Sequence, residues 1–519
     1  MNGARALIST LVGAGVDVCF ANPGTSEMHF VAALDDVEEM RGILCLFEGV
    51  ATGAADGYAR VTGRPAATLL HLGPGLGNGL ANLHNARRAR TPVVNIVGDH
   101  ATYHTRYDAP LESDIAAIAG AVSGWYRSSA RPQDVAADGA DAVAAALGPP
   151  GCVATLVLPA DVSWSEGATG PVPPHPVARP ATVPAETVEE VAKALGSMER
   201  SALLLGGTAL NSRGLHAAAR VTEATGAALL AETFPAAMER GAGIPAPERL
   251  AYLAEMAQAQ LEGVRHLVLV DAKSPVSFFA YPDKASDLVP PGCTVHVLAR
   301  PEEDAPGSLE ALAEAVGAAA HASLPPQAPR PAAPTGALDS QTLAQAIGCT
   351  LPEAAVVVDE GNTAGLFVAG ATQSAPRHDW LTLTGGAIGQ GLPLATGAAI
   401  ACPGRPVLAL EADGSAMYTI SALWTHARED LNITTVIFSN RSYAILRMEL
   451  DRVGAAAAGD ASRSLLDLSR PDLDFTALAA GMGVPASRAT TAPDFAAQLQ
   501  QALAEPGPHL IEAIIPPIG

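Results

Sequence analysis

The amino-acid sequence predicts an α/β protein made of three doubly wound domains, each built on a parallel sheet. Short β-rich runs such as PVVNIVGD, HLVLVDA and TTVIFSN alternate with helical segments of about ten residues or more, which is typical of parallel sheets covered by helices. Two proline-rich stretches, 165–184 and 321–338, interrupt this alternation and read as linkers. They divide the 519 residues into segments of ordinary domain size, at 1–165, 185–320 and 339–519.

The composition excludes several classes of protein. With 49% hydrophobic and 16% charged residues, the chain can bury a large core and is not a disordered or fibrous protein. The net charge of −22 would repel a phosphate backbone, so we expect no nucleic-acid partner. The six cysteines include no C-x-x-C pair, which indicates neither a disulfide framework nor a zinc site and fits a cytoplasmic protein.

The N-terminal residues 1–20 are apolar enough to be compared with a signal segment. Asp17 interrupts them and no small-residue cleavage site follows, so we expect an ordinary first helix. No stretch of 18 apolar residues is free of charges and helix breakers, and we expect no membrane span.

A glycine pattern occurs twice, near the start of the chain and again in its last third. Residues 73–80 (GPGLGNGL) and 385–392 (GGAIGQGL) match at three glycines and a leucine, and both follow a predicted strand and open a predicted helix. We therefore predict that the first and third domains are copies of one fold. The glycines let the backbone approach something closely, either a ligand or simply a neighbouring element.

The strongest chemical signal lies in the third domain. A buried strand ends in Asp413-Gly414-Ser415, a helix is expected over 416–428, and the next strand ends in Asn440. One such crossover puts both strand ends at the same edge of a parallel sheet, where open α/β sheets bind ligands. Carboxylate and amide oxygens suit Mg²⁺, and the Gly414 N–H and Ser415 hydroxyl can donate to a diphosphate. An Asp-Gly turn with an Asn cap would give the same spacing, which alone does not decide between the two.

These residues resemble the signature of thiamine diphosphate (ThDP) enzymes. The run 413–415 with Asn440 and Tyr443 is similar to a motif that usually reads Gly-Asp-Gly-Ser and ends in Asn-Asn, and Ala412 and Ser439 depart from it. The resemblance covers nearly the whole chain and is to the acetolactate synthase, pyruvate oxidase and benzoylformate decarboxylase group. It implies pyrimidine-binding, central and diphosphate-binding domains, in that order.

The resemblance also assigns roles around the cofactor. Asp413, Asn440 and the Ser442 carbonyl would hold Mg²⁺. The Gly386 carbonyl would accept from the 4′-amino group, and Ile388 would bend the cofactor into a V; Ile388 could equally be an ordinary core residue.

A second motif, 47–60 (FEGVATGAADGYAR), resembles the family's cofactor-activating glutamate segment. By that match Glu48 is the catalytic acid, which shares a proton with N1′ of the pyrimidine and so helps to remove the C2 proton. A first-turn glutamate favoured by the helix dipole is the alternative. The presence of the third-domain motif favours the catalytic role.

The substrate pocket is less clearly marked. Thr25 and His71 fall where benzoylformate decarboxylase has its pocket serine and one of its two catalytic histidines, and a histidine can transfer protons near neutral pH. The comparable central segment, 274–281 (SPVSFFAY), offers no second histidine. Ile445 and Glu449 fall on pocket-lining positions, although Glu449 could equally face solvent.

Two further histidines, His100 and His104, could be compared with the paired histidines of pyruvate decarboxylase. They are not adjacent in the sequence, and we do not expect them to be catalytic.

Together these features predict a ThDP- and Mg²⁺-dependent decarboxylase or carboligase that acts through a C2 carbanion on a small or polar 2-oxo acid. A true acetolactate synthase condensing two pyruvates and a catalytically silent ThDP-binding paralogue are the alternatives. The run 270–275 (VDAKSP) lacks the Arg-Phe-Asp-Asp-Arg-like pattern of FAD-binding acetolactate synthases, so we expect no FAD. The resemblance implies a homodimer or homotetramer with active sites at the subunit interface.

Overall fold

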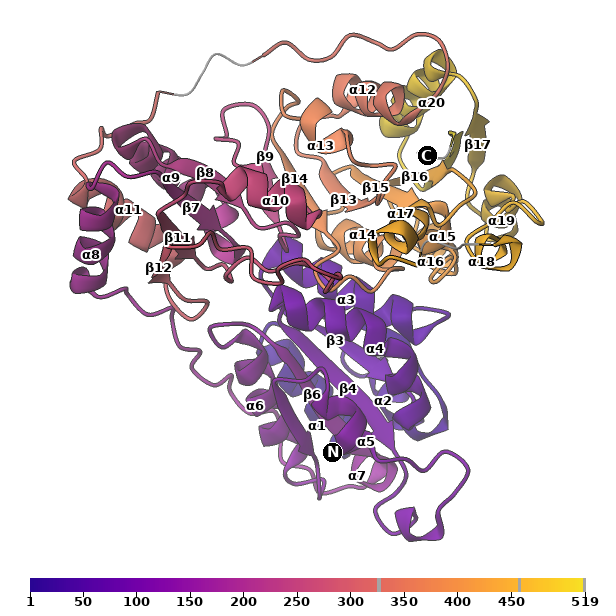
Figure 1. Cartoon of the computed structure of the whole chain (residues 1–519). Helices are drawn as coiled ribbons and strands as arrows, with labels where there is room; N and C mark the ends of the chain where they lie inside the picture. The colour runs from indigo at the N-terminus through magenta and orange to yellow at the C-terminus, as the bar shows by residue number, and fades with distance from the viewer. Residues whose placement is uncertain (324–327, 456–458, 517–519) are drawn as a thin grey trace.

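Three sheets organise the chain in the computed structural model, which describes residues 1–323, 328–455 and 459–516. Each sheet forms the centre of its own lobe: the first lies below, the middle one at upper left and the third at upper right (Figure 1). The predicted fold class, three α/β domains on parallel sheets, is confirmed. The exact domain limits stay predictions.

The first sheet has six parallel strands in the order β2-β1-β3-β4-β6-β5. Strands β3, β4 and β6 are apolar and buried almost throughout, as expected for strands covered on both faces. The N-terminal segment is helical only to Gly13, and the chain then enters β1, so residues 1–20 are a helix and a strand. The strands are β1 (Val18–Asn22), β2 (Arg41–Leu44), β3 (Ala66–Leu70), β4 (Val93–Asp99), β5 (Trp125–Ser128) and β6 (Val153–Pro159); the helices are α1 (Gly3–Gly13), η1 (Thr25–Glu27), α2 (Met28–Ala33), α3 (Glu48–Thr62), α4 (Leu72–Ala89), η2 (Thr105–Tyr107), α5 (Ile115–Gly120), α6 (Val135–Leu147) and α7 (Ala160–Trp164).

The middle sheet has five parallel strands in the order β10-β8-β7-β11-β12. Its central strands β7 and β11 are almost entirely buried and helices pack on both faces. The strands are β7 (Ser201–Leu205), β8 (Ala228–Ala231), β10 (Glu248–Arg249), β11 (His266–Val270) and β12 (Thr294–Ala299); the helices are α8 (Ala185–Leu195), η3 (Gly207–Leu210), α9 (Ser212–Thr225), α10 (Ala254–Leu261) and α11 (Ala305–Ala315).

The third sheet has seven strands in the order β17-β18-β16-β15-β13-β14-β9, and only β9 is antiparallel. Strand β9 (Met238–Arg240) comes from the middle segment, so that segment completes the edge of its neighbour's sheet. The other strands are β13 (Val356–Glu360), β14 (His378–Thr382), β15 (Val407–Ala412), β16 (Ile433–Ser439), β17 (Ala486–Ala489) and β18 (His509–Ile514).

The helices of the third lobe differ from expectation at one place. The helix predicted over 416–428 is interrupted, and α15 (Asp413–Ala416) is separated from α16 (Ala422–Arg428). In the intervening turn the Thr419 hydroxyl donates to the Gly389 carbonyl, so this turn is tied to the loop before α14. The remaining helices are α12 (Ser340–Thr350), α13 (Val368–Ala371), α14 (Gly391–Ala401), α17 (Ala444–Arg452), α18 (Asp460–Ser464), α19 (Phe475–Gly481) and α20 (Ala492–Ala504).

The first and third sheets share one topology. Read from β14, the six parallel strands of the third sheet run β14-β13-β15-β16-β18-β17, which repeats the order of the first sheet strand for strand. The prediction of two copies of one fold is therefore confirmed. The matching glycine runs, however, are not equivalent positions, because 73–80 lies inside α4 after the third strand and 385–392 follows the second strand of its sheet.

Helices α3 and α14 join the first and third lobes through a very close contact. A Cβ atom at Gly57 would lie 2.1 Å from the Leu394 carbonyl oxygen, and one at Gly397 would lie 1.8 Å from the Ala54 oxygen, so only glycine permits this approach. The hydrophobic core is continuous across this contact. It fixes the start of α3, where Glu48 lies, relative to the loop that precedes α14.

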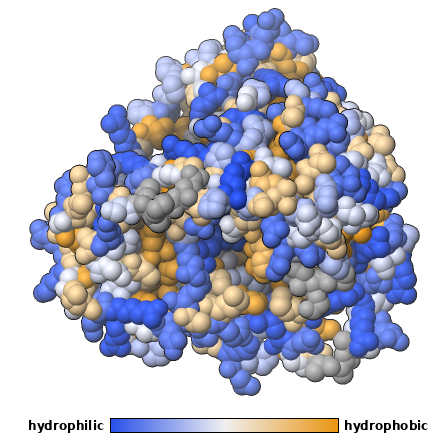
Figure 2. Space-filling model, turned by 90° about the horizontal axis from the view of Figure 1, so that it is seen from above, coloured by the Kyte–Doolittle hydropathy of each residue, from blue (hydrophilic) through white to orange (hydrophobic). Residues whose placement is uncertain are grey.

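The face seen from above is mostly hydrophilic, with weakly hydrophobic residues and small groups of strongly hydrophobic ones between them (Figure 2). Within the part of the chain that the structure describes, no helix is both long and apolar enough to cross a membrane.

Candidate active site

Asp413 and Asn440 follow neighbouring parallel strands at the same edge of the third sheet. Strands β15 and β16 are paired in register up to Ala412 and Phe438, and Asp413 follows directly while Asn440 follows one residue later, so both lie at the predicted edge of the sheet. Asp413 is buried, and its two carboxylate oxygens accept the N–H groups of Gly414 (2.8 Å) and Arg441 (2.6 Å). Burial raises the pKa of Asp413 to about 6, against the effect of these N–H donors. A buried carboxylate held only by N–H groups would be stabilised by a cation.

The other two predicted metal ligands are close to Asp413 in the fold. The Asn440 side-chain oxygen accepts the Ser442 N–H at 3.0 Å, and both residues are buried. Among the hydrogen bonds of the described residues, none is accepted by the Ser442 carbonyl. One carboxylate, one amide and one carbonyl would leave positions for oxygens of a ligand, which is how proteins usually hold Mg²⁺.

No cluster of three or more His, Cys, Asp or Glu side chains suited to a metal occurs within 1–323, 328–455 and 459–516. The predicted Mg²⁺ ligands, one carboxylate with one amide and one carbonyl oxygen, are not a cluster of this kind.

The predicted diphosphate donors already have partners within the chain. The Gly414 N–H donates to Asp413, and the Ser415 hydroxyl accepts from the Asn362 amide at 2.9 Å. The ring of Tyr443 packs on Gly414 so closely that a Cβ there would lie 2.4 Å from it. Donation to a diphosphate stays a prediction for these residues.

Two carbonyls of the loop 385–389, those of Gly386 and Ile388, accept no hydrogen bond among the described residues. Its residues Gly386 and Gly389 have φ of +73° and +90°, which side chains rarely allow. The carbonyls of Gly385, Ala387 and Gly389 accept hydrogen bonds, whereas none to Gly386 is found within the described chain. The first-lobe donors are His84, Asn85 and Asn82, all on α4. The Gly386 carbonyl is thus left available, as its predicted role requires, and Ile388 beside it is only partly buried.

Glu48 and His71 come together on the first lobe. Glu48 begins α3, is 8% exposed, and accepts from the Asn78 amide at 3.0 Å. A Cβ at Gly75 would lie 3.1 Å from a Glu48 carboxylate oxygen and 3.5 Å from the His71 Cβ, so Gly75 makes room between them. In the described chain no hydrogen bond or ion pair joins Glu48 to Asp413 or Asn440.

A buried glutamate that the sequence did not indicate lies behind His71. The Glu27 carboxylate is 2.8 Å from His71 Nδ1 and also accepts the Gly24 N–H at 2.7 Å. Burial raises the pKa of Glu27, while the Gly24 N–H and His71 oppose that rise. Thr25, two residues earlier, is exposed on η1. Nothing in the run 22–27 distinguished the buried acid from an exposed one, so sequence reasoning selected only Thr25.

His100 and His104 do not join this group. Their rings lie 5.3 Å apart in the segment after β4, and His104 also contacts the ring of Tyr107. No hydrogen bond among the described residues connects either one to His71.

The central segment 274–281, which has no histidine, places an aromatic ring against the loop 385–389. The Phe278 ring would meet a Cβ at Gly386 at 2.8 Å, and it contacts the rings of Phe234 and Tyr252. Glu449 faces these aromatic residues: its carboxylate accepts from the Tyr252 hydroxyl at 3.4 Å and lies 3.6 Å from Arg452. Its charge is therefore balanced and is not presented as a free acid.

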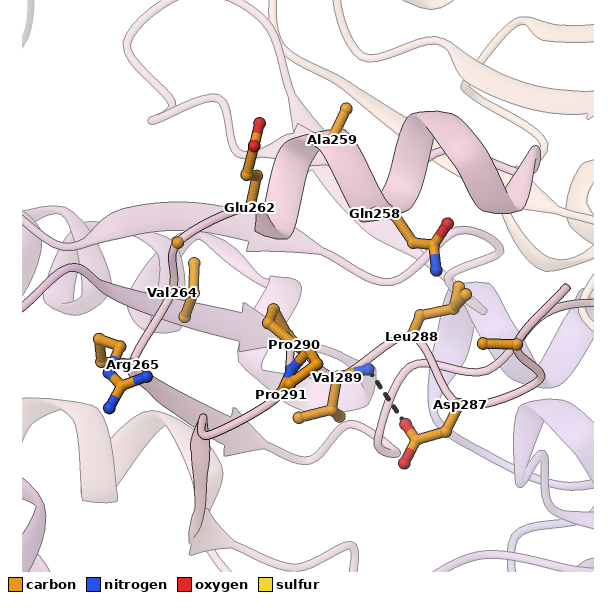
Figure 3. Close-up of a pocket in the computed structure, with 12 residues that line it drawn as sticks. Gln258, Ala259, Glu262, Val264, Arg265, Asp287, Leu288, Val289, Pro290 and Pro291 are labelled. Atoms are coloured by element: carbon orange, nitrogen blue, oxygen red, sulfur yellow. Dashed lines mark hydrogen bonds between the residues drawn. The ribbon is translucent and has the colours of Figure 1, made fainter.

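The pocket drawn in Figure 3 lies elsewhere. It is about 570 Å³ in volume and is lined by residues that precede β11 and β12, including Glu262, Arg265 and Asp287. This is the amino-terminal edge of the middle sheet, opposite the edge where such sheets bind ligands. None of the predicted site residues lines it.

Comparison with known proteins agrees with this arrangement. The model of the "Thiamine pyrophosphate enzyme, N-terminal TPP binding domain" matches residues 1–119, and that of the corresponding C-terminal TPP binding domain matches residues 359–513. The chain belongs to the thiamine pyrophosphate enzyme family. The two matches contain Glu48 and Asp413, respectively.

Two similar sequences and one similar solved structure show to which group of thiamine pyrophosphate enzymes the chain is related. It is 62% identical to the "Putative acetolactate synthase large subunit IlvX" of Mycobacterium tuberculosis strain H37Rv, over 99% of both chains. It is 32% identical to a benzoylformate decarboxylase of Pseudomonas aeruginosa, over 96% of both. The solved structure of a thiamine diphosphate-dependent 4-hydroxybenzoylformate decarboxylase from Rhodococcus jostii RHA1 superimposes with a TM-score of 0.87, at 25% identity and 99% coverage of both chains. The chain is thus an enzyme of the acetolactate synthase and benzoylformate decarboxylase group, which acts on 2-oxo acids.

Proposed function

We propose that this enzyme uses ThDP and Mg²⁺ to decarboxylate a 2-oxo acid, and that it can transfer the product to a carbonyl acceptor. The observation that carries this proposal is the buried Asp413 beside Asn440 at the ends of two adjacent strands. The available Ser442 carbonyl supports it. When bound, the cofactor would supply a C2 carbanion as the nucleophile and a positively charged thiazolium ring as the electron sink for decarboxylation.

In this proposal the third lobe holds the cofactor. Asp413, Asn440 and the Ser442 carbonyl bind Mg²⁺, and Gly414, Ser415 and Tyr443 surround the diphosphate. The Gly386 carbonyl would accept from the 4′-amino group while Ile388 would support the bend, and the Gly386 carbonyl accepts no other hydrogen bond among the described residues.

The first lobe supplies the proton-transfer groups. Glu48 holds a proton at N1′ of the pyrimidine, with the Asn78 amide keeping its carboxyl in place. His71 delivers a proton near the substrate carbonyl, and Glu27 orients its ring. Thr25, exposed at the start of η1, lines the substrate side.

Glu48 and Asp413 meet across a subunit interface in this proposal, in a homodimer or homotetramer. Within one chain no polar contact joins them in the described residues. Large apolar side chains are exposed near both, with Leu46 49% and Tyr418 58% exposed, as expected for surfaces that a second copy covers. The cysteines form no disulfide, which fits the proposed cytoplasmic location.

Acetolactate synthesis from two pyruvates is the second candidate, favoured by the printed name of the relative at 62% identity. We propose that either activity runs without FAD. At the turn after β7 the N–H groups of Gly207 and Thr208 donate to the carboxylates of Glu232 and Asp271, so acids of the chain occupy donors that a nucleotide phosphate would need.

The test combines cofactor binding with a substrate panel. Asp413→Ala should weaken Mg²⁺-dependent ThDP binding in calorimetry by on the order of 100-fold or more, since the only charged metal ligand is lost. Asp460→Ala, an exposed acid of the same lobe, is the matched control and should bind normally. The wild-type chain should release CO₂ from at least one 2-oxo acid. Unchanged binding by Asp413→Ala would overturn the metal assignment.

A further inference from the structure

Glu360, the last residue of β13, holds the loop that carries Gly386 and Ile388. Its two carboxylate oxygens accept the N–H groups of Gly389 at 2.6 Å and Gly391 at 2.5 Å. Glu360 is 2% exposed, so both bonds are shielded from water. Burial raises the pKa of Glu360 to about 7, and the N–H groups of Gly389, Gly391 and Gln390 together with the Ser415 hydroxyl oppose that rise by favouring the charged form.

The loop needs such an anchor because its own backbone is permissive. Two of its glycines have positive φ, and a glycine segment samples more conformations than any other. First-lobe side chains bond to the Gly385 and Ala387 carbonyls, and among the described residues Glu360 alone accepts the N–H groups of Gly389 and Gly391 at the end of the loop. The same strand end reaches the diphosphate side, since Asn362 donates to the Ser415 hydroxyl at 2.9 Å.

Glycine at position 391 is required for this arrangement. A Cβ there would lie 3.1 Å from a Glu360 oxygen and 1.7 Å from an oxygen of Glu411. Glu411 is therefore a close neighbour of Glu360, is fully buried, and neither of its oxygens has a hydrogen-bond partner among the described residues. Both glutamates pack against Gly391, but among the described residues only Glu360 forms hydrogen bonds with the loop.

We propose that Glu360 is a positioning residue that sets the loop 385–391, and through it the Gly386 carbonyl and Ile388, in the geometry that bends the cofactor. The inference rests on the proposed function, and Glu360 itself does not touch the substrate. An amide in its place keeps the volume but turns an NH₂ group toward one of the two N–H donors. That donor then loses its partner.

The experiment compares Glu360→Gln with Glu411→Gln, the same change at an equally buried neighbour without bonds to the loop. The first readout is deuterium uptake by the peptide 384–391 in the full-length, cofactor-free chain, followed by mass spectrometry. In Glu360→Gln the backbone amides of this peptide should exchange at least about tenfold faster than in wild type, because one buried hydrogen bond is lost. Glu411→Gln should exchange like wild type.

The second readout is C2 proton exchange on ThDP at saturating cofactor and Mg²⁺, which Glu360→Gln should slow at least about tenfold. Glu360→Asp has a shorter side chain that cannot reach both N–H groups, so its exchange rates should lie between those of wild type and Glu360→Gln. This variant replaces Glu360→Gln in the test if the Gln variant does not fold. Wild-type values in both readouts for the Gln or Asp variant would overturn the positioning role. A wild-type chain that binds no ThDP would instead overturn the proposed function, while the cofactor-free exchange result would still decide the role of Glu360 in the loop.

Discussion

Three buried glutamates near the candidate site differ in what they contact. Glu27 meets His71, Glu48 meets Asn78, and Glu360 meets two backbone N–H groups. The contacts suit different tasks: orienting a ring, holding a proton and fixing a loop. The residue type is the same in all three, so the partner supplied by the fold decides the task.

The proton-holding task can be tested at Glu48. Glu48→Gln should still bind ThDP, because the metal ligands are untouched, but the C2 proton of the bound cofactor should exchange on the order of 100-fold or more slowly without an acid at N1′. NMR after quenching in deuterated buffer measures this rate. Glu39→Gln, an exposed acid in the same lobe, should behave as wild type. An undiminished rate in Glu48→Gln would leave Glu48 with a structural role alone.

At the scale of elements, α14 connects most parts of the site. It begins after the loop held by Glu360, packs on α3 through glycine contacts, and contacts α16 on another side through Thr396 and His426. His426 is fully buried and its Nε2 contacts the Thr396 hydroxyl at 2.9 Å. Burial lowers the pKa of His426 to about 4, against the Leu392 carbonyl, so the folded state requires the neutral ring.

Acid should therefore destabilise this contact. An unfolded histidine takes up a proton near pH 6.5, whereas His426 resists protonation until about pH 4, so the stability it contributes is complete above pH 6.5 and falls as the pH drops between these values. The slope is at most about 1.4 kcal/mol per pH unit. Urea unfolding at several pH values should show that the free energy of unfolding falls less on acidification in His426→Gln than in wild type. Equal slopes would mean that the pKa of His426 is the same in the folded and the unfolded state.

The elements were largely predictable and the contacts between them were not. Hydrophobic runs and strand-end motifs placed Asp413 and Asn440 together because the geometry of one β-α-β crossover is fixed. Glu27, Glu360 and Asn362 escaped notice because their importance comes from partners distant in sequence. The glycine runs misled for a related reason: similar spacing serves a helix in 73–80 and a loop in 385–392.

At the scale of the whole molecule, the two halves of the proposed site lie on different lobes of one chain. The first lobe carries Glu48 and the third carries Asp413, and α3 and α14 hold the lobes rigidly together. A site assembled from two chains, as proposed, would explain why each half is incomplete alone, and it would explain the apolar side chains exposed near both.

Complementation tests this assembly. Glu48→Gln and Asp413→Ala chains are each expected to be inactive, but a heterodimer of the two contains one site with both wild-type residues. Mixing them after mild dissociation should restore activity, to at most about a quarter of the wild-type value for random pairing of equal amounts. Activity that never rises above that of the separate variants, with chain exchange verified by mass spectrometry, would place each site within one chain.

Strand β9 makes the third lobe dependent on a segment that precedes it by about a hundred residues. Met238 pairs with Trp380, so β9 covers the outer edge of β14 with residues from another lobe. A fragment beginning at residue 339 would leave β14 with a row of unpaired backbone groups, the kind of edge on which chains aggregate. During synthesis, the strand that protects this edge leaves the ribosome before the edge itself exists. Because β9 is synthesised first, it is available to pair with β14 as soon as that strand forms.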